Sequence, residues 1–146
     1  MKMKQRLLGL AVAITTVLSG AGVLGAQPAY ALTDSQMQSI ARGACGSGYS
    51  VVHKTALSTA GTMYLLYAGG YNCAVNVKNS TAGSYHTTSI NMERQSDYAS
   101  KHQSGSFKTY AGPIYLSAPN QCVKYWGSIV TSSRDYLGSS GWVACS

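Results

Sequence analysis

The sequence predicts an all-β domain: a small antiparallel sandwich or barrel of about seven or eight short strands with two disulfides, after a cleaved signal peptide. Three observations lead to this prediction. Short segments rich in Tyr, Val, Thr and Ile alternate with turns that contain Gly and Ser. No long amphipathic helical pattern is present, and four cysteines follow an apolar N-terminal run.

The N-terminus has the pattern of a secretory signal peptide. The first six residues include three basic side chains, and residues 7–24 carry no charge. Residues 29–31, Ala-Tyr-Ala, place small side chains where signal peptidase requires them, so we expect cleavage after Ala31. A retained membrane anchor is the alternative, because the apolar run is near the lower length limit for a bilayer span. The expected organisation is a signal peptide over residues 1–31, a short helical or flexible leader over 32–42, and one disulfide-stapled β domain over 43–146.

The charge of the exported part is modest. Three of the eleven Lys and Arg residues precede Ala31, which leaves eight against four Asp and Glu, a net charge of about +4. The eight basic residues are scattered singly, which argues against a nucleic-acid partner. Either they are ordinary solvated charge, or they give a mild affinity for polyanionic wall polymers or acidic glycans.

All four cysteines lie in the exported part, and an even number there indicates two disulfides. Three pairings are possible in principle. Closure between neighbours in the sequence favours Cys45–Cys73 and Cys122–Cys145, each worth about 3.5 kcal/mol in the chain-entropy model. The cysteines are isolated and have no His at ligand spacing, so we expect no metal site.

The leader, residues 32–42, is the only segment with helical character. Asp34 or Ser35 could cap such a helix, and Met37, Ile40 and Ala41 would share one face.

The clearest strand pair is an antiparallel hairpin formed by residues 62–67 and 73–78 around a Gly-rich loop, residues 68–72. In the second strand Cys73, Val75 and Val77 share one face. The first strand is apolar on both faces, which predicts a central position in its sheet.

The remaining predicted strands are short segments between turn residues: 49–54, 85–92, 106–110, 113–118, 122–129 and 141–145. The polar stretch 95–105 is expected to be an exposed connection. The core is predicted to contain the large apolar side chains Met63, Leu65, Ile114, Trp126 and Trp142.

The sequence offers no recognisable catalytic set. The exported part has four carboxylates and three imidazoles, and no nucleophile elbow or phosphate-binding loop is present. Glu93 and Asp97 are close in sequence, but they lie at the start of an expected loop rather than in a supported cleft. We therefore expect no enzymatic activity, no catalytic residue and no cofactor.

Tyrosine is the one unusually frequent residue. Ten of the eleven tyrosines follow residue 31, several beside Lys, Asn or Thr. An exposed cluster would suit a glycan, a wall polymer or a protein, whereas the alternative is that Tyr fills a half-buried sheet. The candidate binding surface consists of Tyr110, Tyr115, Lys124 and Tyr125.

Three stretches together resemble one known family. They are residues 43–49, Gly-Ala-Cys-Gly-Ser-Gly-Tyr; residues 61–67, Gly-Thr-Met-Tyr-Leu-Leu-Tyr, followed by residues 72–75; and residues 110–116, Tyr-Ala-Gly-Pro-Ile-Tyr-Leu, followed by Cys122 and residues 126–128. Their order and the cysteine framework resemble the spore-associated protein A family of streptomycetes and related actinobacteria. The resemblance implies an exported protein of spores or the cell exterior, with no established enzymatic activity.

We therefore expect a secreted, non-catalytic protein of the spore or cell surface, without a stable membrane anchor after cleavage. Its expected partners are a cell-wall polymer, a glycan or spore-surface proteins, and not nucleic acid. The alternatives are a dedicated binding module for a wall polymer or glycan, and a secreted inhibitor or toxin that acts on another protein.

Overall fold

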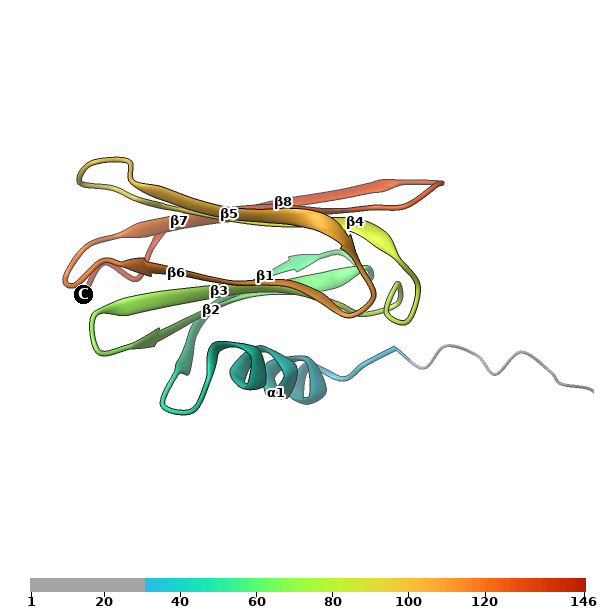
Figure 1. Cartoon of the computed structure of the whole chain (residues 1–146), viewed down its shortest axis with the longest axis horizontal. Coiled ribbons are helices and arrows are strands. Elements are labelled where there is room, and N and C mark those ends of the chain that lie inside the picture. The colour runs from blue at the N-terminus through green and yellow to red at the C-terminus, as the bar shows by residue number, and fades with distance from the viewer. Residues whose placement is uncertain (1–30) are drawn as a thin grey trace, which may run out of the picture.

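The computed structural model describes residues 31–146, which form two stacked antiparallel sheets and one helix (Figure 1). The predicted signal peptide, apart from its last residue Ala31, lies outside the described residues. No helix within residues 31–146 is long and apolar enough to cross a bilayer.

Each sheet has four strands, and the predicted all-β class is confirmed in the form of a sandwich. The first sheet has the order β1-β2-β3-β6 and the second has the order β5-β4-β7-β8. The strands are β1 (Ser50–Leu57), β2 (Gly61–Ala68), β3 (Tyr71–Lys78), β4 (His86–Arg94), β5 (Ser100–Phe107), β6 (Tyr110–Ser117), β7 (Val123–Val130) and β8 (Asp135–Val143).

The predicted hairpin is present as β2 and β3, which pair antiparallel with Thr62 opposite Val77 and Tyr67 opposite Asn72. The strand that is apolar on both faces, β2, lies between β1 and β3 as predicted. Its two faces are both buried because one faces the second sheet and the other faces the helix.

Helix α1 (Asp34–Cys45) packs on the outer face of the first sheet (Figure 1). Its N-cap is Thr33, one residue before the predicted caps, in a reciprocal capping box with Gln36. The helix continues past the expected end of the leader, and its buried side chains Met37, Ala41 and Cys45 contact the sheet. The leader, predicted to be helical or flexible, is therefore helical and is packed against the first sheet.

A polar cluster joins the start of α1 to the first sheet. Asp34 accepts hydrogen bonds from Lys54 Nζ (2.8 Å), Tyr64 Oη (2.7 Å) and Gln38 Nε2 (2.7 Å). These three hydrogen bonds lower the pKa of Asp34 to about 2, and the one from Lys54 has the largest effect.

Acid is expected to loosen this attachment. Because the pKa of Asp34 is lower in the folded protein than its ordinary value of 3.8, the unfolded chain binds more protons between these two values. The melting temperature should therefore fall as the pH is lowered from about 4 to about 2. An Asp34→Asn variant should show a smaller decline over the same range in calorimetry. An equal decline in the variant and the wild type would contradict this assignment.

The space between the sheets contains polar side chains from β3 as well as apolar ones. Asn76 Nδ2 donates to the carbonyl oxygens of Ser89 (2.9 Å) and Ser128 (3.1 Å) in the second sheet. Lys78 is fully buried, its pKa is lowered by burial, and its Nζ donates to the carbonyl oxygens of Ser84 (2.5 Å) and Phe107 (2.9 Å). These hydrogen bonds link the two sheets across the interior.

Several expectations about individual segments were wrong. Residues 100–107 form edge strand β5 and not a loop. The strand lacks an alternating apolar pattern, because the positions opposite the core-facing residues of β4 include Lys101, Gln103 and Gly105. The predicted strand at residues 106–110 is instead divided between the end of β5, a turn at residues 108–109 and the first residue of β6. Met63, Leu65 and Ile114 are in the core as predicted, whereas Trp126 is half-buried and Trp142 is exposed, and neither belongs to the core.

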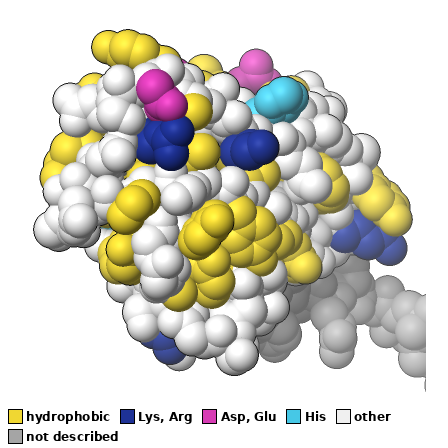
Figure 2. All heavy atoms as spheres, turned by 60° about the vertical axis from the view of Figure 1, so that its left-hand side comes forward, with side chains coloured by type: hydrophobic (Ala, Val, Ile, Leu, Met, Phe, Trp, Pro, Cys, Tyr) yellow, Lys and Arg dark blue, Asp and Glu magenta, His cyan; other side chains and the backbone are white. Residues whose placement is uncertain are grey.

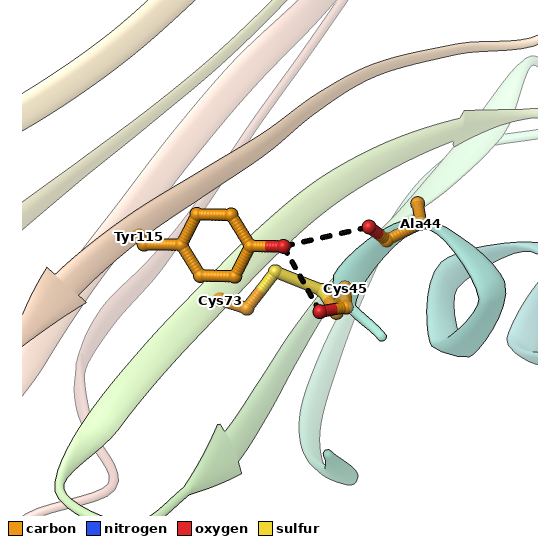
Figure 3. The surroundings of a disulfide bond; sticks show 4 residues. All are labelled: Ala44, Cys45, Cys73 and Tyr115. Atoms are coloured by element: carbon orange, nitrogen blue, oxygen red, sulfur yellow. Dashed lines mark hydrogen bonds between the residues drawn. A yellow bond between two sulfur atoms is a disulfide. The ribbon is translucent and has the colours of Figure 1, made fainter. Parts of the chain in front are cut away.

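The structure contains the two disulfides Cys45–Cys73 and Cys122–Cys145, the pairing that closure between sequence neighbours favours. The first joins the end of α1 to β3 in the layer between the helix and the sheet. Figure 3 shows Tyr115 beside it, with its hydroxyl donating to the carbonyl oxygen of Cys45 at 2.9 Å. The second disulfide joins the start of β7 to the C-terminus.

Candidate functional site

The second sheet has one face in the core and one face that no described element covers (Figure 1). Along β7 the side chains of Val123, Tyr125 and Ile129 are buried, whereas those between them face outward. The outward positions of β7 include Lys124 and Trp126, which therefore lie on the open face.

Three neighbouring strands place a carboxylate, an ammonium group and an indole in one row across this face. Glu93 on β4 is opposite Lys124 on β7, and Lys124 is opposite Trp142 on β8. Lys124 Nζ lies 3.2 Å from Glu93 Oε1 and 4.9 Å from the centre of the Trp142 ring. The ring of Trp126, two residues along β7, is 5.3 Å from the same ammonium group. Lys124 is thus held by one ion pair and by cation–π contacts with two indoles.

A third aromatic ring comes from the turn between β4 and β5. The ring of Tyr98 lies 6.5 Å from that of Trp142 in an edge-to-face arrangement. This turn is fixed by a two-point ion pair, in which Arg94 Nε and Nη2 lie 2.9 and 2.6 Å from the two carboxylate oxygens of Asp97. The hydrogen bond from Arg94 lowers the pKa of Asp97 to about 2. We call Trp126, Trp142 and Tyr98, together with the pair Lys124–Glu93, the aromatic platform.

The aromatic platform borders a shallow hollow in the surface. Its volume is about 670 Å³, and Glu93, Lys124, Trp126, Leu137 and Ser139 are among the residues that line it. Tyr98 is 68% exposed and Trp142 is 37% exposed. Aromatic rings and polar groups are therefore accessible at one place, which is typical of a ligand-binding surface.

The predicted binding surface is not a single surface. Tyr110 and Tyr115 are on β6 of the first sheet, whereas Lys124 is on the second sheet. Tyr115 is partly exposed, but its hydroxyl is engaged with the end of α1. Of the four predicted residues, Lys124 alone belongs to the aromatic platform.

Tyr125 was wrongly placed on the surface, because it points between the sheets and is fully buried. Its hydroxyl lies 2.7 Å from His53 Nδ1 and 2.9 Å from Thr55 Oγ1. Burial raises the pKa of Tyr125 to about 12, so this side chain is a neutral hydrogen-bonding group in the core.

Sequence reasoning missed Tyr98 and Glu93 as site residues, and it assigned both Trp126 and Trp142 to the core. The segment Lys124-Tyr125-Trp126 contained a usable signal. On a strand the first and third of these residues share a face, so the side chains of Lys124 and Trp126 must lie on the same side of the sheet.

The basic side chains do not form a patch on the face that Figure 2 presents, where Lys and Arg lie apart from one another. Within residues 31–146 no group of three or more His, Cys, Asp or Glu side chains is arranged to hold a metal ion.

No protein-family model and no solved structure matches the chain. The chain is similar to spore-associated protein A of Streptomyces coelicolor, with 36% identity over 115 residues, which cover 76% of this chain and 72% of the relative. This degree of similarity confirms the resemblance seen in the cysteine framework and the Gly- and Tyr-containing motifs. The chain belongs to the spore-associated protein A family.

Proposed function

We propose that this chain is an exported, non-catalytic protein that is associated with the spore or cell surface. The observation that carries the proposal is its similarity to a relative named as spore-associated, over most of both chains. The two disulfides support a location outside the reducing cytoplasm. The signal-peptide pattern of the first 31 residues supports the same location.

The environments of the carboxylates favour a non-catalytic role. Asp34, Glu93 and Asp97 are each within 3.2 Å of a Lys or Arg nitrogen, and Asp135 is exposed at the start of β8. A general acid or base needs a free carboxyl group with a pKa near the working pH, whereas these ion pairs hold the pKa of Asp34 and Asp97 at about 2.

The proposal is tested by expressing the full chain in Streptomyces coelicolor and separating culture fluid, washed mycelium and washed spores. Intact mass spectrometry without reduction should find a chain that begins at Leu32 and is four hydrogens lighter than the fully reduced form. This species should be enriched on washed spores or cells.

A matched control lacks residues 2–31 and should remain in the cell lysate. An unprocessed N-terminus would contradict export with cleavage. A processed chain found only in the culture fluid would contradict surface association.

A further inference from the structure

The ion pair of the aromatic platform is accessible and carries no net charge. The side chain of Lys124 is 33% exposed and that of Glu93 is 20% exposed, so both retain contact with solvent. The ammonium group has donor hydrogens, and the carboxylate has acceptor lone pairs, beyond those used between them. Ser139, which also lines the hollow, adds a hydroxyl that can donate and accept.

This combination matches the chemistry of a sugar ring. A pyranose has C–H groups on its faces that can stack on an indole, and hydroxyls around its rim that need both donors and acceptors. The indoles of Trp126 and Trp142 flank a neighbouring donor and acceptor, at Lys124 and Glu93. We propose that the aromatic platform binds a neutral glycan built of pyranose rings. The proposal rests on the proposed function, because an exported surface protein meets such polymers.

The open face offers a path for a chain of sugars rather than for a single ring. Beyond the aromatic platform, the outward positions of β4 and β5 are mostly small and polar: Thr87, Ser89, Asn91, Ser100, His102, Ser104 and Ser106. These side chains provide further hydrogen-bonding groups on a surface over which residues 31–146 place no helix or loop (Figure 1). A longer oligosaccharide should therefore bind more tightly than a shorter one.

The same features disfavour other occupants. A polyanion would gain little from Lys124, because Glu93 already neutralises that ammonium group. A protein partner generally requires an apolar centre from which charged residues are depleted. Here the rings surround an ion pair, and the outward positions of β4 and β5 are polar, so that Leu137 on β8 is an exposed apolar side chain at the margin rather than the centre.

The chain provides its own reporter for this site, because its two tryptophans are Trp126 and Trp142. Purified protein is titrated with chitohexaose and with cellohexaose while tryptophan fluorescence is recorded. We expect a saturable change with at least one of these neutral oligosaccharides, weaker binding of its trimer, and little dependence on salt.

Trp142→Ala should weaken this binding about tenfold, with Trp126 still present as the reporter. Glu93→Gln should also weaken it, because a neutral amide with one acceptor oxygen replaces a charged carboxylate with two. The matched control is Tyr85→Ala, which removes a 66% exposed ring that forms its own cation–π contact with Lys108 at 5.1 Å, beyond the opposite end of β4. This control should leave the affinity unchanged, and circular dichroism should show that all three variants are folded.

Two outcomes would overturn the inference. One is the absence of any fluorescence change with either oligosaccharide at millimolar concentrations. The other is binding that Trp142→Ala leaves intact or that Tyr85→Ala weakens equally. These failures are distinguishable from failure of the proposed function: a protein that is processed and retained on spores, but that does not bind either sugar, contradicts the inference alone.

Discussion

Replacing Gly127 with alanine is expected to lower the free energy of unfolding by about 3 kcal/mol. A Cβ at this position would overlap the carbonyl oxygen of Ser89 on β4 and lie 3.0 Å from Met63 Sδ on the facing sheet. The overlap cannot be relieved by a small shift of β4, because Asn76 Nδ2 binds the carbonyl oxygens of both Ser89 and Ser128 from across the core. The added methyl group therefore forces apart the two central strands of the second sheet.

Urea unfolding followed by circular dichroism measures this loss. The matched control is Gly43→Ala in α1, where a Cβ would meet nothing within 4 Å. Because alanine is favoured over glycine in a helix, this control should raise stability by up to about 1 kcal/mol. A loss below about 1 kcal/mol in Gly127→Ala would show that β4 and β7 can separate without breaking the link through Asn76.

Removing the Cys45–Cys73 disulfide is expected to have the largest effect on stability. The pair is separated by 28 residues, so the chain-entropy model assigns it about 3.5 kcal/mol. The double variant Cys45→Ala, Cys73→Ala also leaves a gap beneath α1, because both sulfur atoms belong to the buried layer between the helix and the first sheet. We expect a total loss of about 4 to 5 kcal/mol in denaturant unfolding.

The matched control is the double variant Cys122→Ala, Cys145→Ala. Its disulfide spans 23 residues, and the entropic contribution is nearly the same, but Cys145 is exposed. The control should therefore lose about 3.5 kcal/mol and little more. Equal losses in the two double variants would show that packing beneath α1 adds nothing to the effect of the crosslink.

The sequence predicted those parts of the fold that local patterns determine. The β2–β3 hairpin and the central position of β2 follow from the Gly-rich turn and from an apolar run on both faces. The edge strand β5 could not be recognised, because one of its faces is open and its inward positions include Gln103 and Gly105. Gln103 reaches across to the other sheet, where its side-chain oxygen accepts a hydrogen bond from the backbone of Gly112. Such a contact depends on tertiary packing rather than on local pattern.

The candidate site was less predictable than the fold. The expectation that large aromatic side chains belong in the core failed for both tryptophans. Strand alternation places Trp126 on the open face, and a register shift in the β7–β8 pairing, with residues 140 and 141 facing Tyr125 alone, turns Trp142 to the same face. The same alternation places Tyr125 inside the core. The row formed by Glu93, Lys124 and Trp142 depends on the register of three strands, and no local pattern in the sequence determines that register.

The placement of α1 gives the molecule two unlike sides. The helix covers the outer face of the first sheet (Figure 1). The aromatic platform lies on the face of the second sheet that points away from the first sheet. Residues 31–33, which lead into α1, therefore lie on the side away from the aromatic platform. A reporter fused ahead of Leu32 would be carried on the helical side, so the protein can be displayed, labelled or tethered by that end while its open sheet lies flat against a surface.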